Sequence, residues 1–410
     1  MPARCRSLTV GPTLRDARSL ARPLAAVLAA ALVACAQSPE PTPPVARTPV
    51  PEALPDVEIR PLGVVHGDWA IVLRSASGYG AADEGELWAV PLAGGEARRV
   101  ISWTASGIGA ADYLRLGLTI VARQLAPDRH RIVLPYAKNG RATFGGGLAI
   151  IDLFSGQFAA LGTPNIQWPT RPAWSPDGKR IAFDTYGSTF WQGISVINAD
   201  GTDLRTVCTA EGFTDSRGMG AFRGCYGVDG WTPDSKRIRF YEVDGYSLID
   251  ADTKAITRYG VHGASLISAD WYGTTSVVAL GAVDGSEQQL LTFDRPDSPP
   301  RTIDRAPRGA LGFFEPRWSP GTENLLYRRG GELFVYGSLG PGRRVVAAQC
   351  EVRGEWHPSG IDVVYLAPCQ GTGELRVAAT IGGANRLVWS PPPGPRSDFR
   401  VVDLAVVRYP

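Results

Sequence analysis

The sequence contains almost none of the short motifs that build a catalytic or metal site from neighbouring residues. Only four of its 410 residues are histidines: His66, His130, His262 and His357. None of them forms H-x-H, H-E-x-x-H or H-x-x-x-H, so a zinc site would need ligands from distant parts of the chain. The G-x-S-x-G turn of hydrolases and the C-x-x-C pair are also missing. We therefore expect no cofactor and no metal ion.

The sequence also lacks an excess of charge of either sign. Residues 1–34 carry five arginines and one aspartate, so the rest of the chain has 37 basic and 39 acidic residues, a balance of −2. A surface that binds nucleic acid would need a clear excess of lysine and arginine. We expect no nucleic-acid partner.

Long apolar runs are scarce, and the clearest one lies near the amino terminus. Leu24 to Ala34 follows several arginines and is too short to span a bilayer permanently, which is typical of a secretory signal. The run ends in Leu32-Val33-Ala34-Cys35, which resembles the bacterial lipobox. The resemblance implies a signal peptide over residues 1–34 and a lipidated Cys35. The alternative is an ordinary signal peptide with a chance cysteine.

Proline dominates the stretch that follows Cys35. Between Gln37 and Pro55 there are seven prolines and almost no large apolar residues, so this segment cannot form a core and should stay extended. Residues 35–56 are predicted to be a tether that reaches up to roughly 60 Å. We expect an extracytoplasmic protein that is lipid-anchored to a bacterial membrane. If the host is Gram-negative, Ala36 after the cysteine resembles outer-membrane sorting.

The stretch from Arg171 to Val207 describes one small antiparallel sheet. Trp174 ends a short strand, Ser175-Pro176-Asp177-Gly178 has the residues of a turn, and Lys179 to Phe183 resumes extended structure. Ile194 to Ile197, the Asn198-Ala199-Asp200-Gly201 turn and Thr202 to Val207 repeat this arrangement. The pattern predicts about four strands in about forty residues.

Copies of this pattern fill the rest of the chain. Trp231-Thr232-Pro233-Asp234, Trp318-Ser319-Pro320-Gly321 and Trp356-His357-Pro358-Ser359-Gly360 repeat the turn, and weaker copies lie at 126–133, 270–273 and 66–69. A second apolar strand follows each copy, at 87–92, 148–153, 246–250, 289–293, 333–336 and 375–378. Seven units result, and they use the whole of residues 57–410.

The paired motifs W-S-P-D-G-K-R-I-A-F and N-A-D-G-T resemble the PD40, or WD40-like, repeat of TolB-type β-propellers. The resemblance implies an all-β fold, a closed β-propeller. The repeat count predicts seven four-stranded blades in a single domain over residues 57–410, with six or eight blades as the alternatives, whereas TolB propellers usually have six blades behind a separate amino-terminal domain. The resemblance implies the architecture only, with no residue-specific role. We expect the terminal strand Arg400 to Val407 to close the ring by pairing near Val57 to Trp69.

Four cysteines remain after Cys5 and Cys35, which suits an oxidising compartment. If Trp356 faces Val363 across a hairpin, the same register places Cys350 opposite Cys369. Cys225 lies six residues before Trp231, as Cys350 does before Trp356, so we expect it to join Cys208 and close the loop Thr209 to Gly224. That loop either binds a partner or caps an edge.

The residues one and three before each signature tryptophan share one face of the innermost strand if the strand alternates regularly. This rule nominates a set of charged residues for the central channel: Arg171, Asp270, Glu315, Arg317, Arg353 and Glu355. The set either binds a polar ligand or peptide, or its members neutralise one another in a filled channel. The tryptophans themselves are expected to pack between blades.

Two functions fit these features. The first is a monomeric, membrane-anchored and non-catalytic propeller that binds an envelope protein, peptide or glycan. The second is a propeller enzyme, a lyase or hydrolase, that acts on envelope polysaccharide with channel carboxylates such as Asp270, Glu315 and Glu355.

Overall fold

A computed structural model gives the fold. It describes residues 57–76, 85–103, 121–137, 146–161, 169–186, 191–214, 220–242, 245–259, 266–272, 276–283, 287–294, 298–307, 312–337, 340–347, 352–367, 373–381, 385–394 and 399–410. The predicted signal peptide, Cys35, the tether, Cys350 and Cys369 lie outside these residues.

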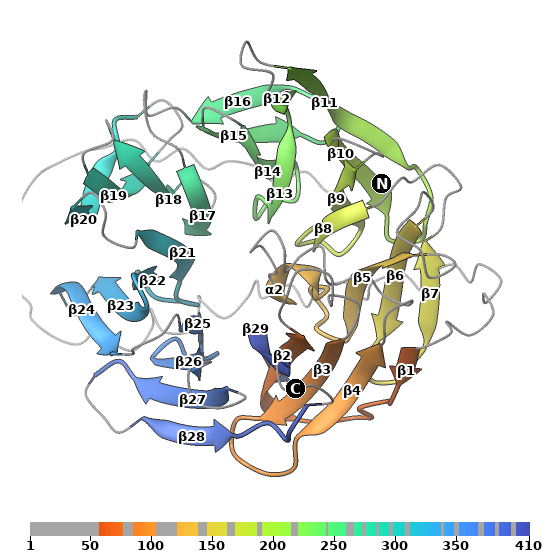
Figure 1. The fold of residues 1–410 in the computed structure, drawn as a ribbon, viewed down its shortest axis with the longest axis vertical. Helices are drawn as coiled ribbons and strands as arrows, with labels where there is room; N and C mark the ends of the chain where they lie inside the picture. The colour runs from red at the N-terminus through yellow and green to blue at the C-terminus, as the bar shows by residue number, and fades with distance from the viewer. Residues whose placement is uncertain are drawn as a thin grey trace, which may run out of the picture. The chain divides into compact units, whose positions relative to one another are not determined.

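Within the described residues, seven antiparallel sheets follow one another around a ring (Figure 1), and we call them blades 1 to 7. Blade 1 has the order β1–β4–β3–β2–β29. Its strands are β1 (Val57–Ile59), β2 (Gly67–Ala76), β3 (Gly85–Pro91), β4 (Arg98–Trp103) and β29 (Phe399–Tyr409). Blade 2 has three described strands, β5 (Arg131–Ala137), β6 (Gly146–Asp152) and β7 (Phe158–Leu161).

Blade 3 carries five strands in the described residues, and blade 4 carries four. Blade 3 consists of β8 (Pro169–Trp174), β9 (Arg180–Tyr186), β10 (Trp191–Asn198), β11 (Arg205–Thr214) and β12 (Gly220–Gly224). Blade 4 consists of β13 (Tyr226–Trp231), β14 (Arg237–Glu242), β15 (Gly245–Asp250) and β16 (Ile256–Tyr259).

In the part of the chain that the structure describes, blades 5 to 7 each carry four strands in chain order. Blade 5 consists of β17 (Leu266–Tyr272), β18 (Ser276–Val283), β19 (Glu287–Phe293) and β20 (Arg301–Pro307). Blade 6 consists of β21 (Phe313–Trp318), β22 (Leu325–Arg329), β23 (Glu332–Gly337) and β24 (Gly340–Val346). Blade 7 consists of β25 (Arg353–Trp356), β26 (Asp362–Ala367), β27 (Glu374–Ala379) and β28 (Arg386–Trp389). The chain therefore folds as an all-β propeller, as the repeats predicted.

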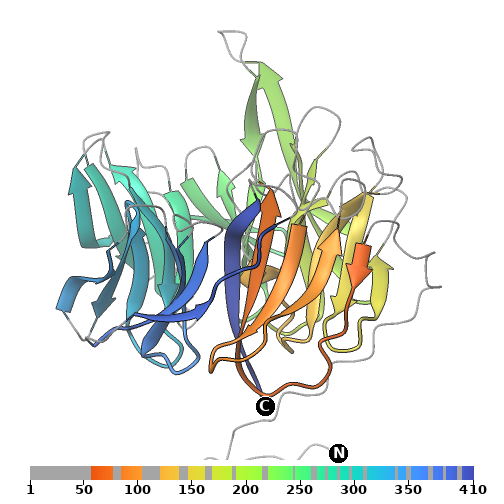
Figure 2. The ribbon, with the colours of Figure 1, turned by 60° about the horizontal axis from the view of Figure 1, so that its bottom comes forward.

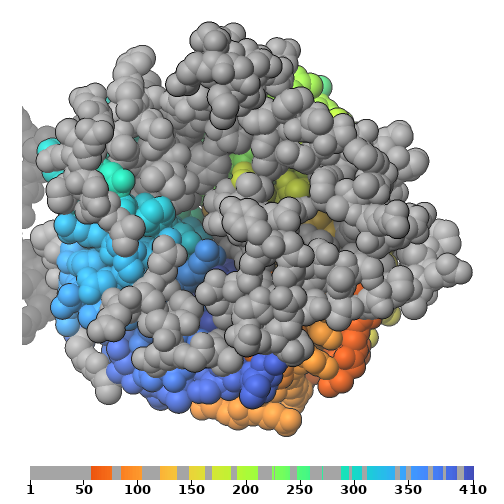
Figure 3. Space-filling view, viewed as in Figure 1, coloured from red at the N-terminus to blue at the C-terminus, as the bar shows by residue number. Residues whose placement is uncertain are grey.

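The carboxyl-terminal strand closes the ring by joining the first blade, as predicted, and its pairing begins at Gly67 and extends beyond Trp69 to Ala76. β29 pairs with β2 from Gly67↔Tyr409 to Ala76↔Phe399 and becomes the innermost strand of blade 1. Val57 instead pairs with Trp103, because β1 lies at the outer edge of the same sheet. In Figure 3 the blue surface of blade 7 adjoins the orange surface of blade 1 along this closure.

Blade 2 has three strands among the described residues instead of the expected four. Its inner position holds one helical turn, α2 (Val121–Gln124), followed by a single bridge from Leu125 to Ile132. The carboxylate of Asp403 on β29 accepts a hydrogen bond of 2.6 Å from the Val121 N–H, a first-turn donor with no partner inside a helix. α2 therefore contacts β29 and β8, the inner strands of the blades on either side.

The hydrophobic core lies between the blades. The cluster between blades 7 and 1 joins Ala70 and Val72 to Leu366, Leu375 and Leu404, all of which are buried. Similar clusters join blades 1 and 2, 2 and 3, 3 and 4, 5 and 6, and 6 and 7. Blades 1, 2, 3, 6 and 7 thus bury both faces against neighbouring blades in the described residues, so the stability of these blades depends on closure of the ring.

The signature tryptophans pack between blades, as expected, wherever their side chains are described. The indole of Trp231 donates to the carbonyl of Ala173 in blade 3 at 3.0 Å, and that of Trp356 donates to the carbonyl of Arg317 in blade 6 at 2.8 Å. Arg180 of blade 3 covers the Trp231 ring at 5.0 Å from its centre. Each contact joins two neighbouring blades.

The register around Trp356 also agrees with the prediction, since Trp356 faces Val363. The same register ends at Arg353↔Leu366 in the described residues, three positions short of Cys350 and Cys369. The disulfide between these two cysteines stays a prediction.

We expect Trp231→Phe to lower the free energy of unfolding by about 1–2 kcal/mol more than Trp103→Phe. Both indoles are buried. The Trp103 nitrogen has no hydrogen-bond partner among the described residues, whereas the Trp231 nitrogen donates a hydrogen bond to the Ala173 carbonyl. Denaturant unfolding of the two variants measures the difference. Equal losses would show that the bond between blades contributes nothing.

Candidate functional site

Two of the innermost strands, β8 and β21, are irregular, so their side chains do not alternate between the two faces as the selection of channel residues from the sequence assumed. The pairing register shifts between Thr170 and Ala173 in β8 and between Phe314 and Arg317 in β21. Arg171 and Glu315, each three residues before a signature tryptophan, have positive φ values of 50° and 52°. Such a conformation is uncommon for residues other than glycine and re-aims side chains at a bulge. The period-two argument is therefore wrong for these strands.

Five of the six nominated residues nevertheless come together. Arg317 Nε lies 3.1 Å from Glu355 Oε1, and Arg353 Nε lies 3.7 Å from Glu315 Oε1. Asp270 accepts a hydrogen bond of 2.8 Å from the Trp318 backbone N–H, and its other oxygen lies 3.7 Å from Arg239. Glu315, Arg317, Arg353 and Glu355 thus form ion pairs between blades 6 and 7.

Arg171 lies on β8, the innermost strand of blade 3. Its guanidinium lies 3.7 Å from Asp184 of β9, a carboxylate that is fully buried. Both oxygens of Asp184 accept from the Val228 N–H in blade 4 at 3.1 Å. This pair therefore joins blades 3 and 4.

The structure adds charged residues that the sequence rule missed. Arg353 also contacts Asp403 at 3.4 Å, Arg328 lies 4.0 Å from Glu315, and Arg123 of α2 forms an ion pair with Asp229 of β13. Arg239 donates to the Asp229 carbonyl at 2.9 Å. We call the ten residues the central network: Asp229, Asp270, Glu315, Glu355, Asp403, Arg123, Arg239, Arg317, Arg328 and Arg353.

Some of the missed residues left a signal in the sequence. Asp403 interrupts the apolar strand V-V-D-L-A-V-V, and Arg239 interrupts I-R-F. A single charge inside a buried strand needs a partner, so such residues could have been nominated. Arg123 left no signal, because its segment matches no repeat.

The protonation behaviour of the carboxylates in the central network differs from one to the next. Burial raises the pKa of Glu315, but the guanidinium groups of Arg353, Arg328, Arg317 and Arg123 outweigh it and leave the pKa below its ordinary value. Burial also raises the pKa of Glu355, and the attraction of Arg317 only partly opposes it. Burial raises the pKa of Asp403 to about 7 despite Arg353 and the Val121 N–H.

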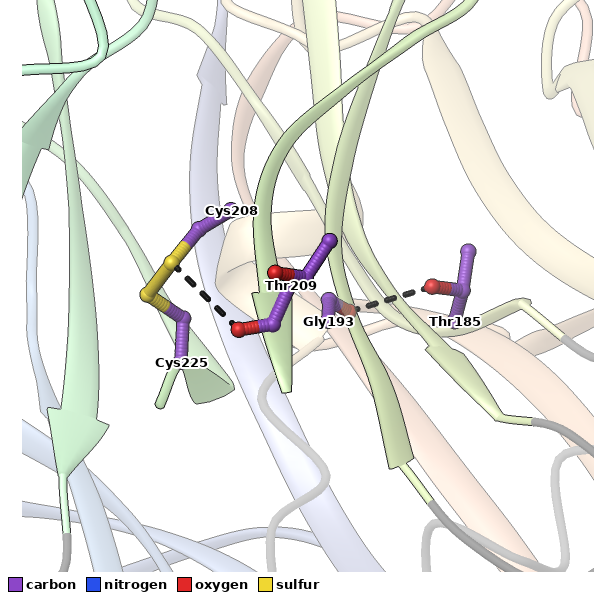
Figure 4. Close-up of a disulfide and its surroundings, with 5 residues drawn as sticks. All are labelled: Thr185, Gly193, Cys208, Thr209 and Cys225. Atoms are coloured by element: carbon purple, nitrogen blue, oxygen red, sulfur yellow. Dashed lines mark hydrogen bonds between the residues drawn. A yellow bond between two sulfur atoms is a disulfide. The ribbon is translucent and has the colours of Figure 1, made fainter. Parts of the chain in front are cut away.

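A second feature is the hairpin of β11 and β12, which extends blade 3. The light-green hairpin projects beyond the other strands of the ring in Figure 2, and Figure 4 shows the disulfide between Cys208 and Cys225 at its base. This pairing agrees with the prediction. Gly193 has φ of +133°, and a Cβ there would lie 2.0 Å from the Cys208 carbonyl oxygen, so only glycine allows β10 to approach the hairpin this closely.

The aspartate-rich turns use their carboxylates for local bonds. Asp200 Oδ1 accepts from the Thr202 N–H at 2.9 Å, and Asp250 Oδ1 accepts from the N–H groups of Asp252 and Thr253 at 3.0 and 2.7 Å. These carboxylates stabilise hairpin turns.

Two surveys of the described part of the chain gave no hits. No helix in it is both long and apolar enough to cross a membrane. None of its clusters of His, Cys, Asp and Glu could hold a metal ion.

No protein-family model matches the chain, and no curated protein matches its sequence. Solved structures do match. The periplasmic gluconolactonase PpgL of Pseudomonas aeruginosa is 15% identical with a TM-score of 0.51, and the match covers 83% of this chain and 100% of that one. A putative 6-phosphogluconolactonase from Bacteroides uniformis is 13% identical with a TM-score of 0.50 over 83% and 100% of the two chains. TolB from Acinetobacter baumannii is 14% identical with a TM-score of 0.42 over 82% and 67%. The two lactonase structures show that the chain shares their propeller fold.

The raised pKa of Asp403 predicts a pH-dependent stability. A carboxyl that ionises near 3.8 when unfolded but at about 7 when folded stabilises the protein fully below the lower value, and this stabilisation is lost as the pH rises through about 7. We expect the stability of the wild type, relative to Asp403→Asn, to fall between about pH 4 and about pH 7.

Asp184→Asn is the control, because burial raises the pKa of Asp184 only to about 6. Above about pH 6 the wild type and Asp184→Asn should change in parallel, while Asp403→Asn diverges from both. Urea unfolding across this pH range measures the three curves. Parallel curves for all three proteins would contradict the assignment.

Proposed function

We propose that the chain is a membrane-anchored, non-catalytic propeller that binds an envelope protein, peptide or glycan. Three features support the proposal: the lipobox-like end of the signal at Cys35, the proline-rich tether over residues 35–56 and the propeller fold of residues 57–410. A lipid at Cys35 would keep the protein outside the cytoplasm at a bacterial membrane.

The mutual pairing within the central network is the observation that favours binding over catalysis. Glu315 lies near Arg353 and Arg328, and Glu355 pairs with Arg317, so the nominated carboxylates are already matched with guanidinium groups. A general acid or base must exchange its proton with a substrate during the reaction. The charges of the central network thus neutralise one another, and we propose the hairpin of β11 and β12 as the surface that binds the partner.

The membrane anchor is tested by Cys35→Ala. We expect the mature protein to move from the membrane fraction to the soluble fraction, because a short apolar signal alone cannot hold it in the bilayer. Cys5→Ala, which changes a cysteine outside the lipobox, should stay with the membrane. If Cys35→Ala still fractionates with membranes, the lipid anchor is wrong.

The binding function is tested by cross-linking in the native host. A photo-reactive residue is placed between β11 and β12, and a second one in β7 serves as the control. We expect the first probe, but not the second, to capture the same envelope protein reproducibly. Recovery of the protein alone with both probes would argue against a protein partner and would direct screening to glycans and small ligands.

The second candidate is a polysaccharide lyase or hydrolase. The specific observation in its favour is the divergence of pKa values, with Glu315 lowered and Asp403 and Glu355 raised within one network, because a catalytic acid and base need opposite shifts. The test is turnover of envelope polysaccharide by the wild type and its loss in Glu315→Gln and Glu355→Gln. Turnover that both variants retain would exclude these carboxylates.

A further inference from the structure

The hairpin of β11 and β12 extends beyond the rest of blade 3 as a ribbon of two strands. The pairing of β11 with β10 ends at Gly193↔Thr209. The pairing of β11 with β12 begins at Ala210↔Gly224 and continues over five residue pairs, and this ribbon projects from the ring in Figure 2. β12 is the outermost strand of blade 3, so no other described strand pairs with its outer edge.

The base of this ribbon is fixed in place. Cys225, which directly follows β12, is fully buried in the core cluster of blades 3 and 4, and the disulfide joins it to Cys208 of β11. Gly224 has φ of +98°, and a Cβ there would lie 2.5 Å from the Thr209 carbonyl oxygen, so glycine allows the two strands to approach closely. The edge of β12 is therefore held in an extended form before a partner binds, which reduces the ordering that binding would cost.

The outermost strands of the other blades have features that prevent pairing with another chain, and β12 lacks them. Those of blades 1, 2, 4 and 7 have only three or four residues, and those of blades 5 and 6 each contain a proline and at least two charged residues. Short strands, proline and charge are common means of blocking a sheet edge. β12 has five residues and no proline, and its single charged residue, Arg223, lies opposite Glu211 in the hairpin. The edge of β12 therefore keeps its capacity to pair with a further strand.

The register of the hairpin indicates which strand would fit this edge. Phe222 lies opposite Gly212, and Arg223 lies opposite Glu211. Since successive residues of a strand belong to opposite faces of the sheet, the two positions need different partners. An apolar residue opposite Phe222 would supply the side chain that Gly212 lacks, and an acidic residue opposite Arg223 would form a favourable cross-strand pair.

We propose that the outer edge of β12 binds an extended segment of a protein partner, which adds to blade 3 as a further strand. This segment carries an acidic residue opposite Arg223 and an apolar residue opposite Phe222. Backbone hydrogen bonds supply most of the affinity, and the added strand stabilises a ribbon that is marginally stable with two strands. This inference rests on the proposed binding function and names the class of partner and its mode of binding.

The test uses the purified wild-type mature chain and the alternating peptide TVTVEVTVT, acetylated and amidated at its ends. In an added edge strand, the N–H groups of successive residues point alternately toward β12 and away from it. Two N-methylated versions of the peptide are compared by calorimetry, one methylated on its four valines and the other on its four threonines. We expect one version to bind as the parent peptide does and the other to bind at least about tenfold more weakly, because only one set of amides pairs with β12. Equal binding by both versions, or no saturable binding of the parent peptide, would overturn the proposal.

A charge exchange identifies the edge that the peptide occupies. The matched peptide TVTVKVTVT should bind the wild type about threefold more weakly than the glutamate peptide, and Arg223→Glu should reverse this preference. Arg301→Glu is the control, because it changes an exposed arginine on β20, the outermost strand of blade 5, and should leave the preference as it is in the wild type. If Arg223→Glu still prefers the glutamate peptide, the peptide binds elsewhere and the proposal is wrong.

The remaining outcomes separate this inference from the proposed function. If Arg223→Glu does not fold, the N-methylated peptides still decide the matter, since they are used with the wild type. A wild type that sediments as a dimer and binds no peptide would assign the edge to a second copy of the chain and reject the inference. Cross-linking at the hairpin uses no peptide. A captured envelope protein together with equal binding of the two N-methylated peptides would therefore reject only the addition of a strand.

Discussion

The pairing of β29 with β2 is the constraint on which the rest of the ring depends. Blades 1, 2, 3, 6 and 7 each bury both faces against neighbouring blades in the described residues, so the packing of these blades depends on the last blade meeting the first. The chain meets this requirement by adding its final strand to its first sheet along ten residue pairs. The same strand carries Asp403 to the centre of the ring, where it holds α2 and Arg353. The strand that closes the ring therefore also supplies one carboxylate of the central network.

Charge gathers at the centre because the innermost strands converge there from different blades. A carboxylate on one inner strand finds its guanidinium partner on the next blade, as Glu355 does with Arg317. Removing one partner of such a partly buried pair leaves an uncompensated charge, which usually costs far more than an exposed pair contributes. The central network thus helps to specify which blades are neighbours, in addition to the apolar clusters between them.

Features that depend on local sequence or on the repeat could be predicted from the sequence. Features that depend on contacts between neighbouring blades could not. The turn after Trp356 implied its pairing with Val363, and equivalent positions before Trp231 and Trp356 implied the Cys208–Cys225 disulfide. The positive φ of Glu315 could not be read from the sequence, because glutamate carries no preference for that conformation. α2 was missed because its contacts are with strands far away in the sequence.

The difference between α2 and an ordinary inner strand bears on how the protein could respond to a ligand. An inner strand is held by a ladder of backbone hydrogen bonds, and moving it would break a blade. α2 has one backbone bridge next to it, at Leu125. It also makes polar contacts with carboxylates of β29 and β13, and its Val121 is fully buried in the core cluster of blades 1 and 2. One of these carboxylates, Asp403, has its pKa raised by burial to about 7, so the charge that holds α2 is sensitive to pH in the neutral range. Because Glu315, Glu355 and Arg353 face Asp403, a change in its charge also alters the pairs of blades 6 and 7. The protonation of Asp403 therefore connects the position of α2 to the ion pairs of blades 6 and 7.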